Sequence, residues 1–295
     1  YEALNDRLVN AESGPINTKV FYDYRAMRPD IKRTSIQTIG VNPSKLSPAF
    51  DHGVFHSKVS LLVNDQKEAW IMTGSANLTL SAWSRNSEGI LIKKIEDRQN
   101  AQAITDFFLG LLESKSDREQ LASLNSYWQR KLSRKSDWQF IHSLANHQLL
   151  DYLKEESCDE MMVWSPYFAE SLSDLIADKM SFVQQLTIIP DITSSGAIRL
   201  TPDELNRLTE QEHVTLCKDL HEYGQELLVH AKVWATPSSL AIGSWNFTKA
   251  GLNIASNANN VEAGIVLQID EKAYLRFKQS LQLKSLAQPK GMELD

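Results

Sequence analysis

The pattern of apolar and polar positions along the chain predicts short strands that alternate with helices. Apolar runs bounded by turn residues cover 54–63, 69–75, 227–235 and 240–244, and such runs are typical of strands. Further strands are expected in four segments, 89–94, 160–168, 186–191 and 263–269. Because strands that alternate with helices favour an α/β fold, we predict mixed, mostly parallel sheets flanked by helices.

Helical periodicity marks the regions between these strands. Apolar residues recur at helical spacing from Ile104 to Leu112, and similar patterns cover 119–132 and 143–153. The segment 201–205 predicts a helix start, with Thr at the N-cap, Pro at the first helical position and Glu closing a capping box. Shorter helix-like stretches are expected over two segments, 78–85 and 247–253.

Two segments of the chain repeat the same polar residues. His-Ser-Lys begins at His56 and His-Ala-Lys begins at His230, so the two histidines are 230 − 56 = 174 residues apart. Each triplet is followed by Gly-Ser-x-Asn. Glu88 follows His56 by 88 − 56 = 32 residues, and Glu262 follows His230 by 262 − 230 = 32 residues. Equal spacing of this kind indicates duplicated modules.

The repeat divides the chain into three predicted parts. Residues 1–97 form a first module, expected to be truncated at its start because the chain begins with Tyr rather than Met. Residues 98–156 form a helical connection packed on the modules, and residues 157–295 form the second module. We expect the two similar modules to face each other across a pseudo-twofold axis, so that their polar residues meet at one centre.

The repeated residue types are suited to phosphate chemistry. A Lys ammonium and an Asn amide bind phosphate oxygens, and the backbone N–H groups of a turn that leads into a helix favour anions. His adds an imidazole that can attack phosphorus or carry a proton near neutral pH. Two such sets provide one His to attack and a second to protonate the leaving oxygen. The predicted catalytic residues are His56, Lys58, Asn77, His230, Lys232 and Asn246.

Two further pairs of repeated residues have weaker signals. Ser75 and Ser244 either contribute to phosphate binding or serve only the Gly-Ser turn. Glu88 and Glu262 either are ordinary exposed carboxylates or accept a hydrogen bond from a His ring nitrogen and fix its tautomer. Their matched spacing favours the second interpretation.

Composition limits the classes of protein. With 42% apolar and 23% charged residues, the chain is typical of a soluble, core-forming protein, and a net charge of −6 argues against a generally basic surface. No run approaches the ~18 apolar residues of a membrane helix, so we expect a cytoplasmic protein without membrane contact. Cys158 and Cys217 form no CxxC pair, and neither a metal nor another cofactor is expected. Trp234 and Trp245 either stack on a base or, as we expect, pack in the core or at its rim.

The paired His-x-Lys and Gly-Ser-x-Asn motifs resemble those of the phospholipase D superfamily, and the resemblance includes Ser-Pro-Tyr-Phe at 165–168. Where that superfamily commonly has an Asp after the Lys, this chain has Val63 and Pro237, as in the tyrosyl-DNA phosphodiesterase branch. The resemblance implies two phospholipase D-like modules and a metal-independent reaction through a covalent phosphohistidine. It also implies that His56 is the nucleophile and His230 the acid.

Three classes of function follow from the sequence. The leading one is a phosphodiesterase that acts on nucleic acid, most simply a nuclease or a DNA-end-processing hydrolase with DNA as its partner. The second is a phospholipid phosphodiesterase or phosphatidyltransferase. The third is a non-catalytic phosphate-binding or nucleic-acid-binding module of a larger protein or complex. The sequence does not choose among DNA, RNA and lipid.

Overall fold

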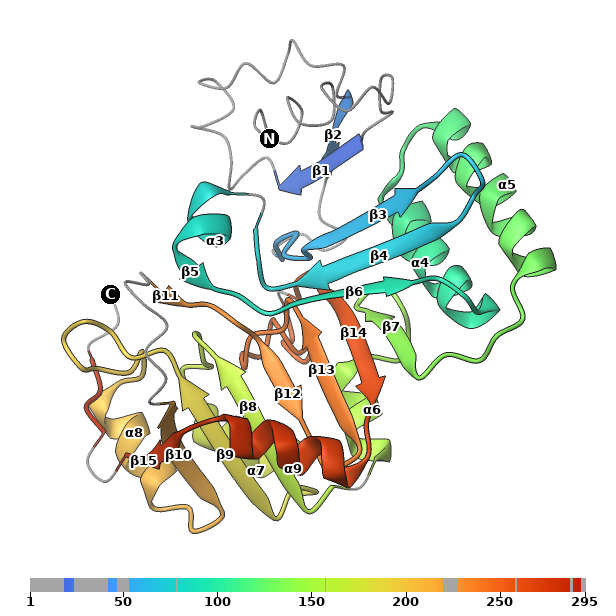
Figure 1. Ribbon diagram of the computed structural model, residues 1–295. Helices are drawn as coiled ribbons and strands as arrows, with labels where there is room; N and C mark the ends of the chain where they lie inside the picture. Colours follow the sequence, from blue (N-terminus) through green and yellow to red (C-terminus); the bar gives the residue numbers. More distant parts are fainter. Residues whose placement is uncertain are drawn as a thin grey trace.

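The computed structural model describes residues 19–23, 42–46, 53–77, 79–156, 158–219, 228–257, 259–286 and 289–292 (Figure 1). Most of the start of the predicted first module therefore lies outside the described residues. Within it, β1 (Lys19–Asp23) and β2 (Asn42–Leu46) form a parallel pair.

The largest element is an eight-stranded mixed sheet with the order β15-β10-β9-β8-β12-β13-β14-β7. Its parallel part contains β8 (Glu160–Ser165), β9 (Gln185–Pro190) and β10 (Val214–Asp219). The other strands pair antiparallel: β7 (Trp138–His142), β12 (Val233–Ala235), β13 (Ser239–Gly243), β14 (Ala263–Gln268) and β15 (Leu283–Ser285). Although it belongs to the predicted helical connection, β7 forms one edge of this sheet.

A second sheet is antiparallel throughout its three strands, β3 (Val59–Val63), β4 (Ala69–Gly74) and β6 (Ile90–Lys94). The predicted α/β class with a mixed sheet is confirmed, whereas the expectation of mostly parallel sheets is wrong for the described strands. The reason is the length of the connections. Only residues 236–238 join β12 to β13, and a parallel crossover needs a dozen residues or more.

Most of the predicted helices are present, and two further helices, one between β8 and β9 and one after β14, were not predicted. Figure 1 shows α3 (Leu80–Ser84), α4 (Arg98–Leu111), α5 (Lys115–Lys131), α6 (Leu149–Glu155), α7 (Leu172–Lys179), α8 (Pro202–Thr209) and α9 (Glu271–Ser280). The helix α8 begins as predicted, because the Thr201 side chain accepts a hydrogen bond from the backbone N–H of Glu204. The helix expected over 143–153 begins only at α6, where Gln148 and Asp151 form a capping box. The stretch 247–253 forms turns instead of a helix, and Asn253 has a left-handed φ of 58°.

The large sheet is covered on both faces, because successive side chains of a strand point in opposite directions. Met161 and Val163 of β8 pack in the same core cluster as residues of α6, α7 and α8, whereas Met162 packs with Tyr274 of α9. Trp234 and Trp245 are both buried in the first of these clusters, so the prediction that they pack in the core is confirmed.

A second core joins the two sheets. Ile71 of β4 packs in one cluster with Ala263 and Ile265 of β14 and with Ile104 of α4. Accordingly, β4 contacts both β13 and β14, and the three-stranded sheet lies against the large one (Figure 1). This stacking brings the two repeated motifs to the same part of the molecule.

Among the helices that the structure describes, none is both long and apolar enough to cross a membrane. The predicted cytoplasmic location stays a prediction.

We predict that Gly264→Ala destabilises the protein by about 1–3 kcal/mol, the usual cost of overpacking a core. Gly264 pairs with Gly243 across β13 and β14, and an added Cβ would lie 2.3 Å from the Trp245 ring. Urea unfolding measures the change. The matched control is Gly110→Ala in α4, where the Cβ meets only the end of the Leu144 side chain at 2.9 Å. That helical substitution should be neutral or stabilising by up to about 1 kcal/mol. Equal destabilisation by both would contradict the packing argument.

Candidate active site

The two histidines lie just outside regular strands. His56 precedes β3, and His230 lies between β11 (Leu228–Val229) and β12. The strands predicted over 54–63 and 227–235 are therefore interrupted at the motifs. The reason is that the backbone before each histidine leaves its own sheet and pairs with a segment from the other half of the chain.

These backbone pairings are reciprocal. Phe55 forms a parallel bridge with Val261, and β11 pairs in parallel with β5 (Asn86–Ser87). The backbone N–H of His56 donates to the Val261 carbonyl at 3.0 Å, and that of His230 donates to the Ser87 carbonyl at 2.8 Å. Each histidine is thus fixed beside the residue that immediately precedes the glutamate of the other half.

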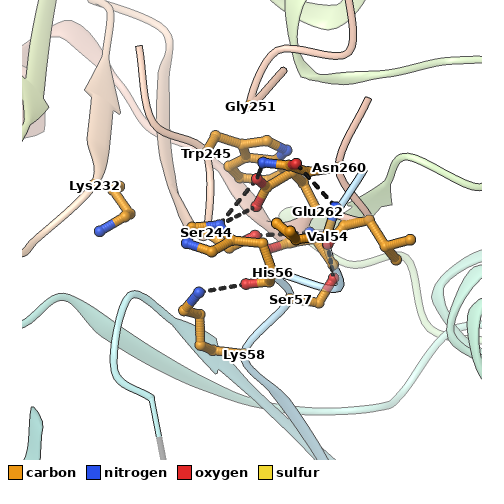
Figure 2. A network of polar contacts seen from close by, with 12 residues as sticks. Val54, His56, Ser57, Lys58, Lys232, Ser244, Trp245, Gly251, Asn260 and Glu262 are labelled. Atoms are coloured by element: carbon orange, nitrogen blue, oxygen red, sulfur yellow. Dashed lines mark hydrogen bonds and ion pairs between the residues drawn. The ribbon is translucent and has the colours of Figure 1, made fainter. Parts of the chain in front are cut away.

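Each glutamate also contacts the histidine ring of the other half of the chain. Nδ1 of His56 lies 2.9 Å from both carboxylate oxygens of Glu262, and Nδ1 of His230 lies 3.0 Å from both oxygens of Glu88. Figure 2 shows the first of these pairs. A carboxylate can only accept, so Nδ1 carries the proton and Nε2 keeps its lone pair in the neutral ring. This is the geometry expected if each glutamate fixes the tautomer of a histidine, as the matched spacing in the sequence predicted.

Two asparagines that sequence reasoning missed support these carboxylates. The Asn260 side-chain amide donates to Glu262 at 3.0 Å (Figure 2), and the Asn86 amide donates to Glu88 at 3.2 Å. A signal was present in the sequence, because 260 − 86 = 174 equals the offset between the histidines. Both amides hold a carboxylate oxygen two residues ahead.

Ser75 and Ser244 fasten the Gly-Ser turns to the glutamate-bearing segments. The Ser75 hydroxyl donates to Glu88 and accepts from the backbone N–H of Gly89 at 2.9 Å. The Ser244 hydroxyl accepts from the backbone N–H of Ala263 at 3.1 Å. Both serines are buried. These bonds serve the turn and, at Ser75, the carboxylate beside it, while phosphate binding by either serine stays a prediction.

The two lysines share one electrostatic environment. The amino group of Lys58 donates to the His56 carbonyl at 2.5 Å, and that of Lys232 donates to the His230 carbonyl at 2.7 Å. Burial lowers the pKa of Lys58 to about 8, against the opposing effect of the two glutamates. Burial lowers the pKa of Lys232 further, to about 6, and the positive charge of Lys58 adds to that decrease. Because Lys58 acts on Lys232, and Glu88 and Glu262 act on both lysines, the two lysines belong to one site.

Burial and neighbouring groups also shift the pKa values of His56 and Glu88. Burial lowers the pKa of His56, and the positive charges of Lys58 and Lys232 add to this, while Glu262 opposes it. Burial alone would raise the pKa of Glu88, but hydrogen bonds from His230 and Ser75 outweigh it and lower the pKa. The structure therefore brings together His56, Lys58, Glu88, His230, Lys232 and Glu262, as the sequence repeat suggested.

The two predicted asparagine ligands differ in their surroundings. Asn246 is buried, and its side-chain oxygen has no hydrogen-bond partner among the described residues. Asn77 is exposed, and within the described ranges no side-chain hydrogen bond joins it to the histidines or lysines. The described contacts therefore do not connect Asn77 to the other predicted catalytic residues, and its role stays a prediction.

The residues that the structure describes contain no group of three or more His, Cys, Asp or Glu side chains that could hold a metal ion. Cys158 and Cys217 are both buried free thiols. Burial raises the pKa of the Cys158 thiol to about 11, as expected for an inert core cysteine.

No protein-family model matches the sequence, and comparison with curated proteins gives no match either. Solved structures do match. A yeast tyrosyl-DNA phosphodiesterase superposes with a TM-score of 0.55 at 12% identity, over 78% of this chain and 70% of that one. A phosphatidylserine synthase of Haemophilus influenzae gives a TM-score of 0.60 at 13% identity, over 97% of this chain and 78% of that one.

Both of these structures belong to the phospholipase D superfamily, and this chain has the same fold. At such low identity, the likeness concerns the fold alone. It is the fold that the paired motifs led us to expect.

We predict that Glu262→Gln lowers the pKa of His56, because Glu262 raises that pKa through its charge and its hydrogen bond. Glu88→Gln should leave the pKa of His56 unchanged, although Glu88 is much nearer to His56 in the sequence than Glu262 is. Titration of the histidine ring signals by NMR separates the two variants. A shift of His56 caused by Glu88→Gln alone would contradict the exchanged pairing.

We also predict that anion binding takes up protons. At pH 7–8 Lys232, with a pKa of about 6, is largely neutral in the free protein. A bound sulfate stabilises its charged form and raises its pKa, so sulfate affinity should fall as pH rises from about 6 to 8. Calorimetry in buffers of different ionisation enthalpy measures the uptake.

Lys232→Met should remove most of that proton uptake, whereas Lys115→Met, at a side chain 91% exposed, should not change it. Sulfate binding with no pH dependence in this range would mean that the buried lysines do not bind the anion.

Proposed function

We propose that the protein is a metal-independent phosphodiesterase that works through a covalent phosphohistidine on His56. The observation that carries this proposal is the exchange of glutamates, which fixes both histidine rings through Nδ1 in one site that also contains the buried Lys232 and the half-buried Lys58. A binding protein would need the lysines but not two histidines held in a defined tautomer.

The proposal includes two similar modules related by a pseudo-twofold axis, with the boundaries 1–97, 98–156 and 157–295 that the sequence suggested. Three features of the described residues support it. The order β3-β4-β6 is matched by β12-β13-β14, each antiparallel and each preceded by its His-x-Lys motif. The His–Glu pairs and the backbone pairings before the histidines are reciprocal in the same way.

In the first step, Nε2 of His56 attacks the phosphorus of a bound phosphodiester. The bond from phosphorus to the leaving oxygen breaks, and His230, which enters this step as the imidazolium with protons on both ring nitrogens, donates its Nε2 proton to that oxygen. The positive charge that develops on the His56 ring is stabilised by Glu262, which accepts from Nδ1–H. Lys58, Lys232 and Asn246 bind the non-bridging oxygens and stabilise the transition state.

In the second step, the neutral His230 takes a proton from water, and the water oxygen attacks phosphorus. The bond between phosphorus and Nε2 of His56 breaks, which releases a phosphate monoester and restores the free imidazole. Glu88 holds the His230 ring in place through its two contacts to Nδ1, both when His230 donates a proton and when it accepts one. The buried lysines supply positive charge, so the mechanism requires no divalent ion for that purpose.

For the substrate, we propose a nucleic acid, with DNA as the first candidate and nuclease or DNA-end processing as the reaction. The fold is shared with a protein named for tyrosyl-DNA and with one named for phosphatidylserine, so it supports phosphodiester chemistry for both substrate classes. A phospholipid diester and a purely binding role are the outcomes against which the proposal is tested.

We expect the protein to hydrolyse at least one substrate in a panel of labelled single-stranded and double-stranded DNA, RNA and phospholipid vesicles, with full activity in EDTA. His56→Ala should abolish turnover and form no adduct. His230→Ala should slow release, so that a covalent species accumulates on His56 when the leaving group is good. Mass spectrometry of the quenched protein detects it.

His147→Ala is the matched control, because this exposed histidine lies outside the site and should keep full activity. Activity lost in EDTA and restored by Mg²⁺ would overturn the metal-independent mechanism. An adduct on His230 in the His56→Ala protein would reverse the two roles, and phospholipid as the only substrate would replace the nucleic acid.

A further inference from the structure

One aromatic side chain is exposed beside the site. Trp234 and Trp245 are buried in the core and cannot stack on a ligand. Tyr167, in the segment between β8 and α7, is 40% exposed, and its ring centroid lies 6.2 Å from that of His230 at an interplanar angle of 79°. This separation lies within the usual range of edge-to-face aromatic contacts. Tyr167 therefore presents open ring surface next to a proposed catalytic histidine.

The backbone of Tyr167 is held firmly at this place. Its carbonyl accepts from the Ser165 hydroxyl at 2.8 Å, and that hydroxyl accepts from the backbone N–H of Phe247 at 3.0 Å. The backbone N–H of Ala169 donates to the Phe247 carbonyl at 2.9 Å. Because Phe247 directly follows Asn246, the segment that carries Tyr167 is tied to the second motif.

Arg199 adds a positive group on the same side. Its guanidinium carbon lies 5.6 Å from the centre of the Tyr167 ring, and its Nη2 pairs with Asp191 at 3.4 Å. Asp191 also accepts from the backbone N–H of Val229 at 3.0 Å, directly before His230. Arg199 is therefore fixed relative to that histidine. A guanidinium has five N–H donors, so one ion pair leaves it able to bind a phosphate.

We propose that Tyr167 and Arg199 form a nucleotide subsite beside His230, where a base stacks on the tyrosine ring and a neighbouring phosphate binds the guanidinium. The inference rests on the proposed function and extends it by naming what is recognised next to the reacting phosphate. Stacking tolerates any base, because every base has a flat π surface. With His230 as the acid, this subsite holds the leaving-group side of the substrate.

A flat ring next to a guanidinium favours a nucleic acid over a phospholipid. The repeating unit of a nucleic acid places a planar base and a further phosphate on the same side of the cleaved bond. A phospholipid has a diacylglycerol on one side of its phosphate and a small headgroup on the other. The paired features of Tyr167 and Arg199 match the first arrangement.

The test measures binding, which does not depend on turnover. The probes are a fluorescent short thymidine oligonucleotide and an abasic tetrahydrofuran-phosphate chain of the same length and charge. With the His56→Ala protein as the parent, the thymidine chain should bind tighter than the abasic one. Adding Tyr167→Ala should weaken thymidine binding by about 5- to 150-fold, the equivalent of the ~1–3 kcal/mol of a base–aromatic stack. Binding of the abasic chain should not change.

Three further variants separate the contributions of the ring and of the guanidinium. Tyr167→Phe keeps the ring and should restore the preference for the thymidine chain. Arg199→Gln should weaken both chains equally and reduce the salt dependence of binding, whereas Arg276→Gln, at an exposed arginine of α9, should have little effect.

The outcomes separate the inference from the function it rests on. Absence of turnover on every substrate, with the preference for thymidine intact, would reject the phosphodiesterase but keep the subsite. Turnover of nucleic acid with equal binding of both chains, or with no effect of Tyr167→Ala, would overturn the subsite. Loss of phospholipid binding alone in Tyr167→Ala would overturn it in favour of a lipid headgroup.

Discussion

Each histidine of the site is held by a carboxylate that comes from the other half of the chain, and the rest of the site depends on this exchange. Glu262 is fully buried, and a buried polar group that loses its hydrogen-bond partner typically costs about 1–3 kcal/mol, and more when the group is charged. Its hydrogen-bond partners are His56, which is 206 positions away in the sequence, and Asn260, which is two positions away. The parallel backbone pairings at Val261 and Ser87 bring these groups together. Neither half alone could place a histidine ring and satisfy its own glutamate.

The second constraint is electrostatic. Lys232 is fully buried and Lys58 is half-buried, and burial disfavours the charged forms of both lysines. An anion that binds between them would relieve this penalty, which is why we propose a phosphate as the ligand of this site. The chain as a whole has a net charge of −6. The proposed binding of an anionic group therefore depends on these two lysines and not on a generally basic surface.

The two half-sites resemble each other in their bonds but differ in their exposure. The His56 side chain is 22% exposed and that of His230 is 9% exposed, and Lys232 is fully buried. Asn246 is buried with an unpartnered oxygen, whereas Asn77 is exposed. Different environments give chemically identical side chains different proton affinities and different access to substrate. A repeated motif can therefore supply two distinct roles. The assignment of attack to His56 and proton transfer to His230 rests on the family resemblance and stays a proposal.

The sequence by itself determined the chemical set and most of the local elements. The motif spacing identified His56, Lys58, Glu88, His230, Lys232 and Glu262. Residue patterns located many of the strands and the capped start of α8, because both are local properties that can be read along the chain. Tertiary structure decided which glutamate serves which histidine, how deeply each lysine is buried, and that Tyr167 rather than Trp245 faces the site. It also decided that 247–253 forms turns and that the sheets are largely antiparallel. These features depend on contacts between residues as far as 142 or 206 positions apart, and no local pattern encodes which distant segment will pack against a given strand.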